Sequence, residues 1–272
     1  MSLFERAAFG DRPDLVVEGL PEDARERWLA AVVLGGQGRY AAAAAVLEDL
    51  RNHPDAELAA LAAATYASHR RQLGGHLAAR AVDAAGLRGL AAAGRYPHAR
   101  EATADVLLGL AADAIGTGGL AEARRLRDAA PRDTWRADVR AGWVSAEIEL
   151  SAGRADLALP HAEAAADRAA GAGSTRHRIK SDLVLAAALG ASDRPMARKL
   201  VTRARDDATD LHLLSLVWPA ALVLADLNPS EATEHRRCAT SVLHGVLRSA
   251  DPRGRGLAER SPWVPSPTGP TG

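Results

Sequence analysis

The chain has 272 residues, of which 47% are hydrophobic but only 4% aromatic, and its 34 basic and 34 acidic residues cancel. This length can hold two domains or one elongated array, and the neutral balance excludes a general electrostatic attraction to nucleic acid, so no such partner is expected. Alanine, the best helix former, is abundant and β-branched runs of period two are scarce, so we expect an all-α protein.

The first 20 residues are expected to be a lead-in to a helical domain over residues 21–249. They mix charges of both signs and hold no long apolar run, so the sequence predicts no signal peptide. One cysteine, Cys238, excludes an internal disulfide and is consistent with a reducing compartment. The most apolar stretch, 213–227, is too short to span a bilayer and contains Pro219, so it predicts a buried helix. We therefore expect a cytoplasmic protein without a membrane partner.

A five-residue spacing between a glycine and an alanine returns along the chain. The pairs are Gly38–Ala43, Gly74–Ala79, Gly118–Ala123 and Gly153–Ala158, followed by Ser192–Ala197 and Leu227–Ala232 without the glycine. The alanines are separated by 36, 44, 35, 39 and 35 residues. This period is typical of stacked helical hairpins.

Each hairpin is expected to be a helix, a tight turn and a second helix. The glycine ends the first helix because it adopts the left-handed conformation at no steric cost. Small residues such as Ala31, twelve places before Ala43, are expected where the two helices cross. One hairpin cannot bury its apolar face alone, so neighbours stack into a superhelix.

The first copy resembles the tetratricopeptide repeat (TPR) family, and the resemblance covers roughly residues 20–248. The matching residues are Ala31, Gly38, Tyr40, Ala43, Leu47, Leu50 and Pro54. The resemblance implies a right-handed α-solenoid of about six stacked antiparallel helix pairs, and an irregular α-solenoid is the alternative. Polar residues stand where the family has apolar ones at Asp83, Arg127 and Arg236. Abundant alanine, and arginine in place of lysine, indicate a GC-rich bacterial genome.

The 44-residue interval holds an extra segment at 87–100. A longer second helix followed by a loop around Gly94–Pro97 would accommodate it. We expect any bend between two lobes of the domain at this place.

The resemblance also implies an inner groove lined mainly by the first helix of each pair. The residues that it places there are Arg25, Trp28, Ser68, Arg71, Asp105, Arg136, Arg140, Trp143, Glu147 and Asp182. Arg140, Trp143 and Glu147 share one helix face because they are three and four residues apart. An arginine beside a tryptophan can make a cation–π contact of about 0.5–1 kcal/mol or bind a carboxylate bidentately. The groove is thus predicted to receive a peptide or acidic motif; alternatively, Trp28 and Trp143 are packing residues.

A basic turn occupies residues 174–182. Its cations are Arg176, His177, Arg178 and Lys180, around a helix start that Ser174 or Thr175 would cap. Helix N-termini bind anions through free amides and the macrodipole. The turn is therefore a candidate site for a phosphate or acidic peptide, with a solvated basic turn as the alternative.

No motif for catalysis or for a cofactor stands out. Glu231, His235 and Cys238 share a helix face with His244 beyond, but one helix cannot close a zinc site, so no metal is expected. The stretch AIGTGGLAEA at 114–123 lacks the ending of a phosphate loop and a preceding strand. We expect a protein without enzymatic activity.

From residue 250 proline, glycine, serine and threonine replace apolar residues, which predicts an extended or disordered tail over 250–272. Trp263 is its exception. It is either idle in a solvated tail or an anchor that docks onto the protein's own groove or onto a partner.

The leading hypothesis is an adaptor whose concave groove binds a peptide or a segment of another protein. The alternative is a ligand-sensing regulator that binds a small anion or signalling peptide. A second copy of the chain could also fill the groove, so a homo-oligomer is possible within either hypothesis.

Overall fold

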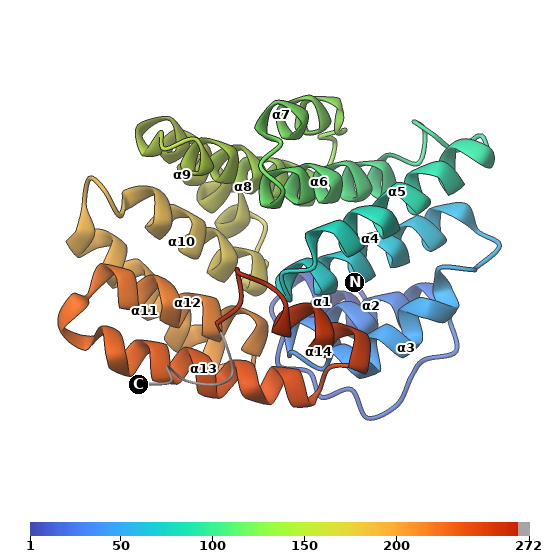
Figure 1. The fold of residues 1–272 in the computed structure, drawn as a ribbon. Coiled ribbons are helices and arrows are strands. Elements are labelled where there is room, and N and C mark those ends of the chain that lie inside the picture. Colours follow the sequence, from blue (N-terminus) through green and yellow to red (C-terminus); the bar gives the residue numbers. More distant parts are fainter. Residues whose placement is uncertain (266–272) are drawn as a thin grey trace.

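A computed structural model of the chain describes residues 1–265, and every regular element in this range is helical. Successive helices pack against one another along the chain (Figure 1), so the prediction of an all-α, repeat-like array is confirmed. The elements are α1 (Leu3–Phe9), α2 (Ala24–Gly36), α3 (Tyr40–Leu50), α4 (Ala56–Gln72), α5 (His76–Ala92), α6 (Arg100–Gly116), α7 (Leu120–Ala129), α8 (Trp135–Ser151), α9 (Ala155–Gly171), α10 (Thr175–Leu189), α11 (Arg194–Asp210), α12 (Leu214–Leu227), the 3₁₀ turn η1 (Pro229–Glu231), α13 (Ala232–Arg248) and α14 (Pro252–Glu259).

Glycines with left-handed backbone separate helices at the predicted places. Gly38, Gly74, Gly118 and Gly153 have φ values of 78°, 73°, 81° and 73°. Each lies two residues beyond the end of a helix, after α2, α4, α6 and α8 respectively. An L-residue with a Cβ would be strained in this conformation, which explains why glycine recurs here.

The small residues of the repeat lie where neighbouring helices touch. Completely buried alanines occupy the position five residues after the glycine at Ala43, Ala79, Ala123 and Ala158, and five residues after Ser192 at Ala197. Completely buried alanines also occupy the position twelve residues before four of these alanines, at Ala31, Ala67, Ala111 and Ala146, and twelve residues before Ala232, at Ala220. The same position before Ala197 is the partly buried Leu185. Because alanine has no side chain beyond Cβ, it lets helix backbones approach closely at these crossings.

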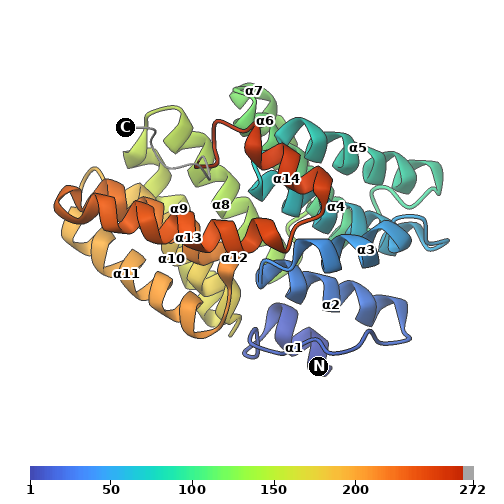
Figure 2. The same ribbon diagram turned by 60° about the horizontal axis from the view of Figure 1, so that its bottom comes forward.

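The two ends of the array meet, which the sequence did not predict. Helix α2 packs against α12, and α1 packs against α10. The Thr175 amide at the start of α10 donates to the Gly10 carbonyl over 3.0 Å, and Ser215 Oγ on α12 donates to the Gly36 carbonyl over 2.7 Å. The array therefore closes into a ring rather than leaving an open concave groove (Figures 1 and 2).

The C-terminal segment is ordered further than its composition suggests. Asp251 caps α14 by accepting from the Gly254 amide over 3.0 Å, and Pro252 occupies the first helical position, where a missing amide costs nothing. Leu257 lies against Gly75, so α14 covers the turn between α4 and α5. The prediction of an extended or disordered tail is wrong for residues 252–259, and its last part, 266–272, lies outside the described residues.

The predicted buried helix at 213–227 is confirmed as α12, whose residues are mostly buried and which includes Pro219. No helix within residues 1–265 is long and apolar enough to cross a membrane. The insertion at 87–100 also forms as predicted, with the 17-residue α5 followed by a loop through Gly94 and Pro97. The bend expected there stays a prediction.

Candidate functional site

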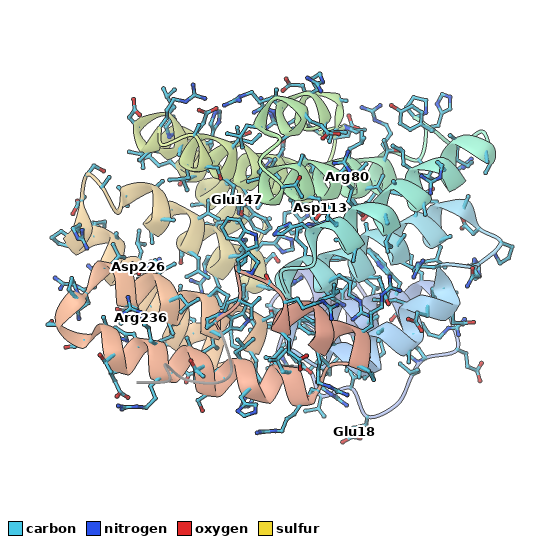
Figure 3. The ribbon with its side chains drawn as sticks, viewed as in Figure 1. Glu18, Arg80, Asp113, Glu147, Asp226 and Arg236 are labelled. Carbon is cyan, nitrogen blue, oxygen red and sulfur yellow. The ribbon has the colours of Figure 1, made fainter. Side chains whose placement is uncertain are left out.

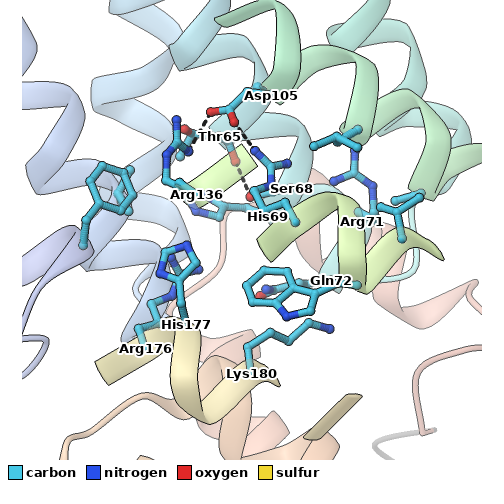
Figure 4. A pocket seen from close by; sticks show the side chains of 18 of the residues that line it. Thr65, Ser68, His69, Arg71, Gln72, Asp105, Arg136, Arg176, His177 and Lys180 are labelled. Atoms are coloured by element: carbon cyan, nitrogen blue, oxygen red, sulfur yellow. Dashed lines mark hydrogen bonds and ion pairs between the residues drawn. The ribbon is translucent and has the colours of Figure 1, made fainter. Parts of the chain in front are cut away.

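A cavity of about 210 Å³ lies inside the ring. Its wall comes from α1 and from α2, α4, α6, α8, α10 and α12, the inner helices of the described array. One water molecule needs on the order of 10–15 Å³ by this kind of measure, so the cavity can hold an organic molecule. Figure 4 shows its polar wall, with Asp105 and Arg136 facing His177 and Lys180 across the space.

Aromatic rings form one side of the cavity. The indole Nε1 of the fully buried Trp28 donates to Thr65 Oγ1 over 2.9 Å. Trp143 is fixed similarly, because its Nε1 donates to Ser181 Oγ over 2.8 Å. The His177 ring stacks on Trp143 with 5.5 Å between centroids. Both tryptophans therefore pack against the fold and also line the cavity.

Two guanidinium groups share one buried carboxylate on α6. Asp105 accepts from Arg136 Nη1 over 2.8 Å and from Arg140 Nη1. Arg136 also donates to Glu101 over 2.8 Å, and Glu101 is shared in turn with Arg25. Positive charge therefore exceeds negative charge at this part of the wall.

Arg71 on α4 is held by two carboxylates that are completely buried. It donates to Asp113 Oδ1 over 2.7 Å and to Asp83 Oδ2 over 2.6 Å. Burial raises the pKa of Asp83 well above its ordinary value, against the opposing effect of Arg71. The bonding capacity of Arg71 is thus largely committed to the fold.

The side chain of Arg176 on α10 has no hydrogen bond or ion pair with any residue of 1–265, although it lines the cavity. Burial lowers its pKa, Tyr40 acts against this effect, and the charges of Arg140 and Arg136 add to it. Lys180, one turn further along α10, donates to Glu147 Oε1 over 3.3 Å. Arg176 is therefore a cation of the cavity wall with which no carboxylate of the described chain forms an ion pair.

The two histidines of the cavity stay neutral at ordinary pH. Burial, with the charges of Arg176 and Arg70, lowers the pKa of His69 to about 3. Burial, with nearby arginines, also lowers the pKa of His177 well below its usual value. His177 Nδ1 lies 2.8 Å from Ser174 Oγ, but Ser174 is only 1% exposed. A hidden hydroxyl beside a weakly basic imidazole is poorly suited to nucleophilic catalysis.

A second hollow of about 340 Å³ lies beside the cavity. The two share Arg71, Gln72, Glu147, Lys180 and Leu216. The rest of its wall is mostly apolar, with Leu150, Leu183, Val184, Ala187, Trp218, Pro219, Val223, Trp263 and Val264. Trp263 is 62% exposed and lies edge-on to His76, with 6.5 Å between centroids. Trp263 therefore lies against a hollow of the protein itself, which is one of the positions predicted for it.

Most residues predicted for the groove line the cavity. They are Trp28, Ser68, Arg71, Asp105, Arg136, Arg140, Trp143 and Glu147. Arg25 lies outside this lining, with its guanidinium 5.2 Å from the Trp28 ring centroid. Asp182 does not line the cavity either, and it pairs with Arg178 on α10 and with Arg203 on α11.

The basic turn divides between two environments. Arg176, His177 and Lys180 line the cavity, whereas Arg178 donates to Asp182 and Asp207. The turn is packed rather than solvated, since the first amide of α10 is bonded to the loop after α1.

Further cavity residues were not predicted. His69 and Gln72 on α4 directly follow the predicted Ser68 and Arg71, and Phe9 belongs to the segment predicted to be a lead-in. Asp83 is a polar residue at a repeat position that is usually apolar, which indicated a buried charge. The repeat pattern did not predict its partner on α4, Arg71.

Exposed charged residues near the ends of α12 and α13 stand apart from this site. Figure 3 shows Asp226 and Arg236 at the edge of the ring and Glu147 and Asp113 near its middle. Asp226 and Arg236 are 80% and 60% exposed. His235 lies 3.5 Å from Glu231, but residues 1–265 contain no cluster of three groups suited to a metal ion.

No protein-family model matches the chain, and no curated protein matches it significantly. The site is therefore interpreted from its own geometry.

Proposed function

We propose that this chain is a ligand-sensing protein without enzymatic activity that binds a small organic anion in the inner cavity. The observation that carries the proposal is Arg176, a cavity cation without a carboxylate partner among the described residues. A carboxylate or phosphate group would supply the missing charge and could accept two parallel hydrogen bonds from the guanidinium.

Ring closure supports a small ligand over a long peptide segment. The cavity is bounded by six inner helices and α1, and contacts between α2 and α12 join its two ends. An anion held by Arg176 on α10 and Arg140 on α8 would couple neighbouring helices and stabilise one arrangement of the ring. A ligand that binds one arrangement more tightly shifts the population toward it, which is the basis of sensing.

A thermal-shift screen with small carboxylates and phosphates tests this function. We expect a binding anion to raise the melting temperature, because a ligand at 100 times its dissociation constant stabilises the fold by about 2.7 kcal/mol. Arg176→Gln should remove the shift, whereas Arg236→Gln on the exposed outer face should retain it. A screen without shifts, or equal shifts in both variants, would contradict the proposal.

The second candidate is an adaptor that binds another protein or a peptide through the same surface. Trp263 favours it, because this exposed tryptophan stands beside the second hollow, and exposed tryptophans are frequent anchors in protein interfaces. The acidic terminus of a peptide would then reach the arginines through this hollow. Acidic and neutral peptides of equal length, titrated into Trp263→Ala and the unchanged chain, would test this candidate.

We further propose that the array is TPR-like, right-handed and built from about six helix pairs, in a protein of bacterial origin. The support is the succession of α2/α3 through α12/α13 together with the recurring glycines with positive φ. An experimental structure would test the handedness and the pairing.

A further inference from the structure

The charged cavity and the apolar hollow are two parts of one space. Arg71, Gln72, Glu147, Lys180 and Leu216 line both. These residues come from α4, α8, α10 and α12, so the junction is a neck surrounded by four helices. A molecule long enough to pass this neck would contact both parts.

The two parts differ in chemistry. Arg136, Arg140 and Arg176 line only the first, where they are compensated incompletely by Asp105 and Glu101. Beyond the shared residues, no charged side chain of residues 1–265 lines the second part. Positive charge is therefore concentrated at the inner end and apolar surface at the outer end.

The outer end reaches the surface beside the C-terminal segment. Val264 is buried against the hollow, while the neighbouring Trp263 remains 62% exposed. The Trp218 indole forms part of the wall, and its Nε1 is buried without a hydrogen-bond partner in the described chain. The hollow is on the order of the 300 Å³ at which ligand pockets begin.

We propose that the ligand is an amphipathic anion, with its acidic head beside Arg140 and Arg176 and its hydrocarbon chain in the hollow near Val223. This inference rests on the proposed function and specifies the ligand class. A purely polar anion would leave the apolar hollow filled with water, and a purely apolar molecule would leave Arg176 uncompensated. Only a molecule with both parts matches both ends, since apolar contact and charge pairing are then satisfied together.

A chain-length series measured by isothermal titration tests the proposal with acetate, hexanoate, octanoate and decanoate. Affinity is expected to rise about fourfold with each added CH₂ that enters the hollow, the effect of burying one methylene. Decanol should bind at least about tenfold more weakly than decanoate, because it lacks the charge that Arg176 recognises. Decyl phosphate forms a parallel arm that compares the affinity of the cavity for a phosphate head with its affinity for a carboxylate head.

Variants at each end separate the two contributions. Arg176→Gln should weaken every anion of the series about tenfold or more and leave the dependence on chain length unchanged. Val223→Phe, which fills the hollow, should flatten the dependence on chain length and leave acetate binding unchanged. Ala187→Leu narrows the same hollow from α10 with little risk to the core, because Ala187 is exposed at its edge. It should reproduce the effect of Val223→Phe.

The outcomes distinguish failure of this inference from failure of the proposed function. If acetate and decanoate bind equally and both depend on Arg176, the cavity binds anions but the amphipathic ligand is wrong. If decanol binds as tightly as decanoate, the acidic head is wrong. If no member of the series binds the unchanged chain, both the ligand class and the anion-binding function are contradicted.

Discussion

Arg70 and Asp251, which are 181 residues apart in the chain, form an ion pair with 2.7 Å between Nη1 and Oδ2. The Arg70 side chain is only 3% exposed and that of Asp251 22%. This pair ties α14 to α4 and so joins the C-terminal segment to the N-terminal half of the ring (Figure 2). A buried guanidinium without a partner is unfavourable, so the pair makes the position of α14 depend on one carboxylate.

Asp251→Asn should therefore loosen α14. Asparagine caps helices as well as aspartate, so the change removes the charge and spares the cap. We expect a loss of about 1–2 kcal/mol in the free energy of unfolding. This loss is smaller than the loss expected for a fully buried ion pair, because Asp251 is partly exposed to solvent. Chemical denaturation measures it, with Asp193→Asn as a control, since Asp193 caps α11 without an ion pair within residues 1–265. Equal effects of the two variants would show that the pair contributes nothing.

Two adjacent glycines at the end of α2 should respond differently to alanine. A Cβ on Gly35 would stand 1.9 Å from His69 Nε2, and the His69 ring is stacked on Tyr40 at 5.1 Å between centroids. A Cβ on Gly36 would meet its nearest atoms at 3.4 Å. Gly35→Ala should cost about 1–3 kcal/mol in stability through overpacking, whereas Gly36→Ala should change it by less than about 1 kcal/mol. Thermal or chemical unfolding of both variants measures this difference, and similar stabilities would contradict the position of His69.

The helices and their turns could be predicted from the sequence because they depend on local patterns. Gly38 and Gly74 mark turns through backbone conformation alone, and buried alanines such as Ala43 follow at a fixed distance. The same repeat period predicts that alternate helices line the inside of the array. Asp251 and Pro252 fit the local pattern of a helix start, but the prediction for the tail was made from its composition and did not include α14.

The closure of the ring and the buried charge pairs could not be predicted in this way. The bond from Ser215 to the Gly36 carbonyl joins residues 179 apart, and no local pattern specifies such a contact. Arg71 was predicted to line the groove, but its ion pairs could not be predicted because its partners, Asp83 and Asp113, lie on other helices. The cavity is therefore visible only after the helices are placed.

Stability should fall as pH decreases below 6.5 because two cavity histidines resist protonation. Burial lowers the pKa of His69 to about 3 and that of His177 well below its ordinary value. Between pH 6.5 and 3 the unfolded chain binds more protons at these residues than the folded chain does, so stability rises with pH across this window. Each histidine contributes up to about 1.4 kcal/mol per pH unit.

Chemical denaturation at several pH values between 5 and 7 measures this slope. This range lies above the pH values at which the titration of carboxylates dominates the change in stability. His69→Gln should reduce the slope, and the exposed His161→Gln should leave it unchanged. An unchanged slope in His69→Gln would mean that His69 titrates freely in the folded protein.

Arg71 and Arg176 line the same cavity, yet only the removal of Arg71 should lower stability. Arg71→Met leaves Asp83 and Asp113 buried without their cation, which should cost about 3–5 kcal/mol. This cost should be smaller at pH 5 than at pH 8. Burial already raises the pKa of Asp83, so in the folded variant its carboxylate can take up a proton at low pH. As pH rises this proton is lost, and the variant becomes less stable relative to the unchanged chain.

Arg176→Met removes a cation whose charge burial disfavours and which has no carboxylate partner within residues 1–265. The ligand-free variant should be as stable as the unchanged chain or more stable by about 1 kcal/mol, as expected where a binding site retains an unfavourable charge for function. Denaturation of both variants at pH 5 and pH 8 measures the contrast. If Arg176→Met were destabilised as strongly as Arg71→Met, Arg176 would serve the fold, and the cavity would lose the free cation on which anion binding depends.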